Sequence, residues 1–163
     1  MESRVVKKPR EPEGVRNKKT LTPWNGVVEN PDDYEGFVYC ITRNEGMYYV
    51  GMKFTKSRRR VKQKDSARRK RVEKDSDWKH YKGSSKELLK DIKQLGQEAF
   101  DFTILGWYKT RSGVRYAEMR EQVRNDVLND PNSYNSNVMN RFFKGNIGMR
   151  DQEWRWMNIA DLH

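Results

Sequence analysis

The chain has 163 residues, a length that suits one domain or one small domain with tails, and a formal net charge of +11 from 34 Lys and Arg against 23 Asp and Glu. Hydrophobic residues make up 34% and aromatic residues 12%, which predicts a small core beside a good deal of solvated chain. No apolar run approaches the roughly 18 residues of a membrane span, no signal peptide is evident, and one cysteine excludes an internal disulfide, so we expect a cytoplasmic protein with no membrane partner.

Residues 1–35 predict a flexible N-terminal arm, because mixed charges and four prolines leave few apolar positions. Within this arm, Trp24 together with Val27 and Val28 could pack against the domain. The β-branched and aromatic residues of 36–42 predict a strand, 43–46 a turn and 47–52 a second strand. The pair predicts a β-hairpin.

The excess charge is concentrated behind this hairpin. Residues 53–74 hold 12 basic and 2 acidic residues, whereas the segments on either side are close to neutral. This run has no Gly or Pro and few apolar positions; a helix is compatible with it, but such a helix could not bury a face of its own. It is either a solvated, self-repelling loop or localisation signal, or an arm that contacts DNA phosphates with salt-sensitive affinity.

The second half of the chain predicts a helix, a strand and a helix. Residues 84–87 have the spacing of a capping box, 88–95 carry an apolar helical stripe, and Gly96 ends it. Residues 100–108 predict a third strand and 115–129 a second helix, followed by an aromatic tail over 146–163. The expected fold is α/β in the α+β sense: a small, three-stranded, mainly antiparallel sheet flanked by helices.

Two triplets within the hairpin carry a family resemblance. Phe37-Val38-Tyr39 and Tyr49-Val50-Gly51 are nine residues apart, and this pairing resembles the motif of GIY-YIG nucleases. The resemblance covers roughly residues 36–145, with a basic insertion at 53–82. The runs from Trp78 to Lys86 and from Glu118 to Asn135 resemble a phage-encoded branch, the Seg-like homing endonucleases. This resemblance implies a DNA endonuclease acting in the cytoplasm of a bacterial host cell.

The resemblance implies a role for each motif residue. Tyr39 and Tyr49 correspond to the motif tyrosines, one a general base or proton relay and the other a support for water or phosphate. Arg59, eight residues beyond Gly51, corresponds to the catalytic arginine, and Glu118 to the carboxylate that holds one Mg²⁺ (or Mn²⁺) ion. Asn135 corresponds to a late structural asparagine. Gln63 departs from the family, which often has His or Tyr at that position.

The chemical requirements of phosphodiester hydrolysis are consistent with this assignment. Phosphodiester hydrolysis needs an activated water and stabilisation of charge on the phosphate, and Mg²⁺ prefers hard oxygen ligands. Tyrosine is a poor base at its reference pKa of about 10, and we expect nearby cations to lower the tyrosine pKa. Double-stranded DNA is the expected partner, and its predicted contacts are Lys53, Arg58, Arg60, Arg68, Arg69, Arg71, His80, Lys82 and Ser84.

Several alternatives stay open at this point. Arg58 and Arg60 compete with Arg59 for the catalytic role, and Glu121 competes with Glu118 for the metal. Each tyrosine alone could simply pack in a strand, and Asn135 could serve a turn. A catalytically inactive nucleic-acid-binding module on the same fold is the alternative function, and a homodimer is a further option. A zinc-supported HNH site is excluded because the chain has only two histidines.

Overall fold

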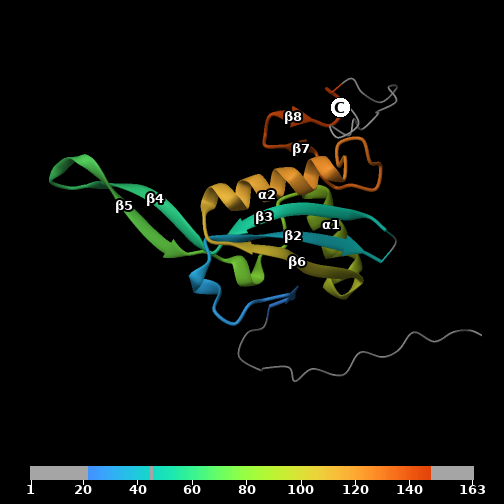
Figure 1. Cartoon of the computed structure of the whole chain (residues 1–163), viewed down its shortest axis with the longest axis horizontal. Coiled ribbons are helices and arrows are strands. Elements are labelled where there is room, and N and C mark those ends of the chain that lie inside the picture. The colour runs from blue at the N-terminus through green and yellow to red at the C-terminus, as the bar shows by residue number, and fades with distance from the viewer. Residues whose placement is uncertain (1–21, 45, 148–163) are drawn as a thin grey trace, which may run out of the picture.

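The computed structural model describes residues 22–44 and 46–147, which form a twisted sheet with a helix on each face and a long projecting hairpin (Figure 1). The sheet has the strand order β1-β6-β2-β3. Strand β2 (Gly36–Arg43) lies antiparallel to both β3 (Tyr48–Phe54) and β6 (Phe100–Tyr108), and the short β1 (Trp24–Asn25) pairs parallel with β6. The three predicted strands are confirmed, and β3 lies at a free edge of the sheet.

Side chains alternate between the two faces of the sheet, so each face packs on a different helix. Helix α1 (Lys86–Leu95) covers the face that carries Phe37, Tyr39 and Ile41, and it contributes Leu88 and Ile92 to that cluster. Helix α2 (Arg111–Arg124) covers the opposite face, where Val38 and Val50 meet residues of the helix. The mixed α+β class is therefore confirmed.

The helix boundaries differ from the expected ones because other residues act as caps. Ser85, one residue later than the capping box suggested, accepts a hydrogen bond from the Leu88 amide and begins α1. Helix α2 was expected at 115–129, but Thr110 accepts from the Gly113 amide at 3.0 Å and starts the helix at Arg111. After Arg124 the chain turns, and Asp126 adopts a positive φ of 46°.

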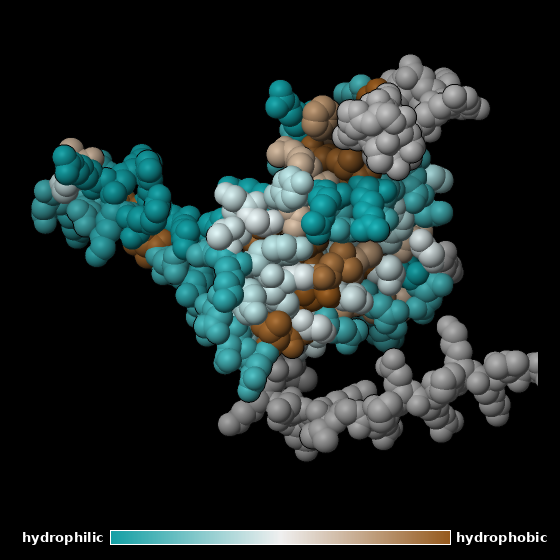
Figure 2. Space-filling model, in the orientation of Figure 1, coloured by the Kyte–Doolittle hydropathy of each residue, from teal (hydrophilic) through white to brown (hydrophobic). Residues whose placement is uncertain are grey.

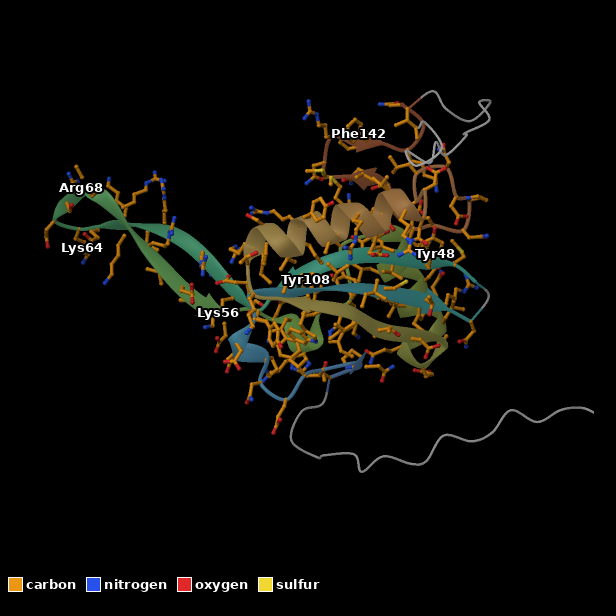
Figure 3. All side chains as sticks on the ribbon, viewed as in Figure 1. Tyr48, Lys56, Lys64, Arg68, Tyr108 and Phe142 are labelled. Atoms are coloured by element: carbon orange, nitrogen blue, oxygen red, sulfur yellow. The ribbon has the colours of Figure 1, made fainter. Side chains whose placement is uncertain are left out.

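The basic run forms a β-hairpin, and a helix is excluded. Strand β4 (Lys56–Gln63) pairs antiparallel with β5 (Ser66–Asp75), and almost every side chain of the two strands is exposed. Figure 2 shows the projection as a nearly continuous hydrophilic surface, and in Figure 3 Lys56 lies at its root and Lys64 and Arg68 at its tip. An extended ribbon sends neighbouring side chains to opposite faces, whereas a helix would stack like charges at i, i+3 and i, i+4.

The described part of the N-terminal segment packs on the sheet. Trp24 is buried, stacks edge-on against Phe37 and Phe102, and donates its indole N–H to the Trp78 carbonyl at 3.0 Å. Two further short strands, β7 (Asn137–Val138) and β8 (Phe142–Phe143), pair beyond α2. Within 22–44 and 46–147, no helix is long and apolar enough to cross a membrane. The aromatic residues Trp154 and Trp156 lie outside the described residues.

Candidate active site

The free edge of β3 organises the site. Alternate backbone groups of an edge strand point away from the sheet and need partners from elsewhere. At Tyr48 these partners are backbone groups of the 132–134 loop: the Tyr48 amide donates to the Asn132 carbonyl at 2.9 Å, and the Tyr134 amide donates to the Tyr48 carbonyl at 2.8 Å. Side chains take over this role at the next two outward positions, Val50 and Met52.

Asn135 and Gln122 satisfy the edge at Val50. The Asn135 side-chain oxygen accepts from the Val50 amide at 3.0 Å, and its NH₂ donates to the Val50 carbonyl at 2.8 Å. The Gln122 NH₂ donates to the same carbonyl at 3.1 Å. Both amide side chains are buried. Asn135 therefore holds the backbone of the second triplet in place.

Glu118 is the next side chain in the row along the β3 edge, and it satisfies the backbone at Met52. Its carboxylate accepts hydrogen bonds from the Met52 backbone and from the Gln122 side chain, the latter at 3.3 Å. Burial nevertheless raises the pKa of Glu118 to about 7, because the ionised carboxylate loses solvation that these two donors only partly replace. Glu121 lies elsewhere on the helix, with its carboxylate 3.4 Å from the Arg120 guanidinium.

A polar cavity of about 290 Å³ opens beside this row. Glu118, Gln122 and Asn135 line it from α2 and the loop that follows, and Tyr49 and Tyr81 line it from the other side. The remaining walls are mostly small polar side chains, at positions Ser84, Ser85, Ser136, Asn137 and Asn140. The cavity thus brings together one carboxylate and several hydroxyl and amide groups from four separate parts of the sequence.

The two motif tyrosines lie side by side, with ring centroids 6.1 Å apart. Tyr49 lines the cavity and shares a 2.9 Å hydrogen bond with the Ser84 hydroxyl, whereas Tyr39 is almost fully buried. A Cβ added at Gly51, which pairs with Tyr39 across the strands, would come within 2.5 Å of the Tyr39 hydroxyl and 2.8 Å of the Tyr49 ring. Glycine at this position is what lets both rings share one face.

Burial raises the pKa of both tyrosines, contrary to the expected lowering by cations. For Tyr39, burial is the largest cause of the raised pKa, and the neighbouring Tyr49 and Tyr81 hydroxyls raise it further. For Tyr49, burial outweighs the Ser84 hydrogen bond, which acts in the opposite direction. Both phenols are therefore proton-bearing hydrogen-bonding groups at neutral pH.

Lys53 is the predicted DNA contact that lies against this arrangement. Its ammonium group sits 3.8 Å from the centroid of the Tyr81 ring and 2.6 Å from the Asp77 carboxylate. The Tyr81 ring in turn packs on Tyr39, with centroids 6.2 Å apart. Among the other predicted contacts, Ser84 lines the cavity, His80 is exposed and Lys82 is half-buried.

The arginine predicted to be catalytic lies apart from Glu118. Arg58, Arg59 and Arg60 are exposed on β4 and line a second cavity, of about 270 Å³, together with Arg71 and Arg111. None of the three lines the cavity of Glu118 and Tyr49. Arg68 and Arg69 lie farther out on β5 (Figure 3 labels Arg68), on the exposed part of the hairpin.

The donor set fits a hard cation held by few protein ligands. No group of three or more His, Cys, Asp or Glu side chains converges anywhere in 22–44 and 46–147. Gln122, however, whose NH₂ donates to Glu118, has a side-chain oxygen that is buried and has no hydrogen-bond partner among the described residues. A carboxylate and an unpaired amide oxygen are the oxygen ligands that Mg²⁺ accepts, with water and phosphate oxygens completing its shell.

Sequence reasoning gave no role to Gln122 or Tyr81. Gln122 follows Glu118 by four residues and so lies on the same face of α2, a spacing that signals proximity once the helix is known. Tyr81 directly follows the short 3₁₀ helix Trp78–His80 and precedes Gly83, whose φ is 90°. No local pattern indicates that this loop returns to the two tyrosines.

Comparisons with known proteins identify the family of the chain. The chain matches the model of the SegE GIY-YIG domain over residues 19–147. It is also 43% identical over 58 residues to Endonuclease segA of Enterobacteria phage T4, a match that covers 36% of this chain and 26% of that relative. The match thus spans about a quarter of the relative's length, and no solved structure matches the chain. Because the family model covers most of the chain, this protein belongs to the SegE GIY-YIG domain family.

Proposed function

We propose that this protein is a metal-dependent DNA endonuclease that hydrolyses phosphodiester bonds in the cavity beside β3. The observation that carries the proposal is the position of Glu118: its carboxylate lines a polar cavity together with the Tyr49 hydroxyl. The relative segA is named an endonuclease, and the family resemblance supports DNA as the substrate here.

Each side chain of the cavity has a chemical task in this proposal. Glu118, which the Gln122 NH₂ holds in place at 3.3 Å, binds a Mg²⁺ or Mn²⁺ ion. When bound, the ion supplies positive charge next to the phosphate oxygens on which negative charge develops. Tyr49, protonated because burial raises its pKa, hydrogen-bonds the attacking water or a phosphate oxygen. Tyr39 positions the Tyr49 and Tyr81 rings, and Asn135 fixes the strand that carries Tyr49.

The β4–β5 hairpin serves as the DNA clamp in this proposal. It carries most of the excess charge of the chain, and its cationic side chains are exposed on a ribbon that projects beyond the sheet (Figure 1). A two-stranded ribbon is narrow enough for the major groove of duplex DNA. Contacts between these cations and phosphates would give affinity that falls steeply with salt.

Cleavage of supercoiled plasmid DNA tests the catalytic part. We expect cleavage in Mg²⁺, none in excess EDTA, and a loss of at least about a hundredfold in Glu118→Ala, comparable to removing one electrostatic stabiliser. Glu121→Ala is the matched control on the same helix and should cleave like the wild type. Cleavage that survives both EDTA and Glu118→Ala would refute the mechanism.

Binding measurements separate the clamp from catalysis. Replacing Arg68, Arg69, Lys70 and Arg71 together by Gln should weaken binding to any duplex and flatten the dependence of log Kd on log salt, by up to about 0.9 per lost phosphate contact. An unchanged slope would remove the clamp from the proposal. Intact DNA at every metal concentration, with tight salt-sensitive binding, would instead support a catalytically inactive binding module.

A further inference from the structure

The second cavity, at the root of the hairpin, is lined entirely by arginines. Its volume is about 270 Å³, and its walls come from β4, β5 and the first residue of α2: Arg58, Arg59, Arg60, Arg71 and Arg111. It shares no lining residue with the cavity of Glu118. Five guanidinium groups around one hollow repel one another unless an anion lies between them.

Two of these arginines already lie within 4 Å of a carboxylate, and their contacts fix one wall of the cavity. Arg58 donates to Glu35 at 2.6 Å and to Glu73 at 2.7 Å. Arg111 stacks on the Phe54 ring at 3.6 Å and donates to the Lys56 carbonyl at 3.1 Å. Its guanidinium lies 3.7 Å from one oxygen of the Glu35 carboxylate, and this oxygen is buried without a hydrogen-bond partner in the described part of the chain.

The other three arginines have no such partner. In the described part of the chain, no carboxylate lies within 4 Å of the guanidinium groups of Arg59, Arg60 or Arg71. Burial, and then repulsion from Arg58, lowers the pKa of Arg111. The carboxylates at this end of the hairpin therefore leave positive charge uncompensated in the cavity.

The register of the hairpin shows where this compensation stops. Lys56 pairs with Asp75 and Arg58 with Glu73, two cross-strand pairs of opposite charge. The next pair on the same face is Arg60 with Arg71. Like charges directly opposite each other destabilise a strand pair, so this pair is unfavourable for the hairpin alone and becomes favourable when an anion bridges the two side chains.

We propose that the arginine cavity binds one phosphodiester group of the DNA backbone, away from the bond that is cut. This inference rests on the proposed function, because it takes DNA as the substrate. Planar guanidinium groups match the oxygens of a phosphate in paired hydrogen bonds. The cavity thereby fixes the position of the duplex relative to Glu118, and Arg59 binds this phosphate instead of contacting the cleaved one.

The spacing along α2 suits this task. Arg111 and Glu118 are seven residues apart on one helix, or about 10 Å along its axis at 1.5 Å per residue. This is roughly the rise of three nucleotides along one strand of B-DNA at 3.4 Å each. A rigid helix with a phosphate site near its first residue and a carboxylate two turns later can therefore set the distance from the anchored phosphate to the cleaved one.

A titration with inorganic phosphate tests the site without DNA or metal. In ¹⁵N-labelled protein we expect saturable shifts of the Arg58 and Arg111 side-chain Nε–H resonances, absent with chloride at the same ionic strength. The double variant Arg60→Gln/Arg71→Gln should bind phosphate roughly tenfold more weakly, because it loses two charge-assisted donors. Arg68→Gln/Arg69→Gln removes the same charge farther along the hairpin and should titrate like the wild type.

Binding of a short duplex, in a Glu118→Ala background that prevents cleavage, identifies the source of the phosphate. We expect Arg60→Gln/Arg71→Gln to lose about tenfold or more in affinity, and more than Arg68→Gln/Arg69→Gln loses, because a shared phosphate engages several donors at once. Its melting temperature should equal or exceed that of the wild type, since a repulsive pair is removed. A folded variant with weaker binding excludes a merely structural role.

Three outcomes would overturn the inference. Equal phosphate titrations in the two double variants, or equal losses of DNA affinity, would show that only total charge matters. Phosphate binding lost in Arg60→Gln/Arg71→Gln without any loss of DNA affinity would assign the cavity to a free phosphate or nucleotide. None of these results bears on plasmid cleavage by the wild type. Absent cleavage with intact phosphate binding would instead refute the proposed function alone.

Discussion

The side chain of Asn135 makes two hydrogen bonds to the backbone of Val50, one to the amide at 3.0 Å and one from its NH₂ to the carbonyl at 2.8 Å. In effect a single residue acts as a neighbouring strand at the free edge of β3. The two residues are 85 positions apart in the chain. Because Tyr49 and Gly51 flank Val50, this contact links the loop after α2 directly to the candidate active site.

Removing this contact should destabilise the protein. In Asn135→Ala the Val50 amide is left buried without an acceptor, whereas the carbonyl keeps Gln122. We expect a loss of about 2–3 kcal/mol in the free energy of unfolding, the cost of an unsatisfied buried group, measured by urea denaturation. Asn132→Ala, at an exposed position of the same loop, should stay within about 0.5 kcal/mol of the wild type; equal losses at 132 and 135 would contradict this account.

The raised pKa of Glu118 predicts a stability that depends on pH. Below the unfolded value of 4.5 the carboxyl is neutral in both states; between 4.5 and about 7 only the folded state keeps its proton. The folded protein therefore loses stability over this window as pH rises, by on the order of 3 kcal/mol in total. Glu118→Gln should accordingly be more stable than the wild type at pH 8 in EDTA and nearly equal to it at pH 4.5.

Thermal or urea unfolding of wild type, Glu118→Gln and Glu121→Gln at several pH values checks this prediction. Glu121→Gln is the control because its carboxylate faces Arg120 outside the cavity. A difference between wild type and Glu118→Gln that does not change with pH would show that burial does not perturb this carboxyl.

Ser84 tunes the hydroxyl of Tyr49. Their 2.9 Å hydrogen bond lowers the pKa of Tyr49 against the larger effect of burial. Ser84→Ala should therefore raise the pKa of Tyr49 further, which is measurable by NMR titration of ring-labelled tyrosine, with Tyr49→Phe identifying the resonance. Ser136 lines the same cavity, and Ser136→Ala should leave the titration of Tyr49 unchanged. A lowered pKa in Ser84→Ala would reverse the assigned role.

Trp24 belongs to the core despite its place near the N-terminus. It packs against Phe37 and Phe102 and is 4% exposed, whereas Val27 is 37% exposed. Trp24→Ala should lower the free energy of unfolding by about 3–5 kcal/mol, as expected for a buried aromatic residue. Val27→Ala should change it by less than about 0.5 kcal/mol. Similar small effects at both positions would mean that β1 adds nothing to the stability of the sheet.

The strands were predictable because their information is local. The β-branched and aromatic segments 36–42 and 47–52 match β2 and β3, and 100–108 coincides with β6. The two triplets also indicated the family, which the family model confirms. The basic run was harder to interpret, because a charged segment without apolar periodicity has no preferred element until cross-strand pairing fixes one.

By itself, the sequence determined strands β2, β3 and β6, the family and the concentration of charge behind the second triplet. Only the tertiary structure decided which side chains share a cavity. It grouped Glu118 with Tyr49, Gln122 and Tyr81, and it placed Arg59 with Arg111 in a separate cavity. The physical reason is that the free edge of β3 must find hydrogen-bond partners from segments far away in the chain. Which residues meet there depends on the path of the whole backbone, and no spacing within one segment records it.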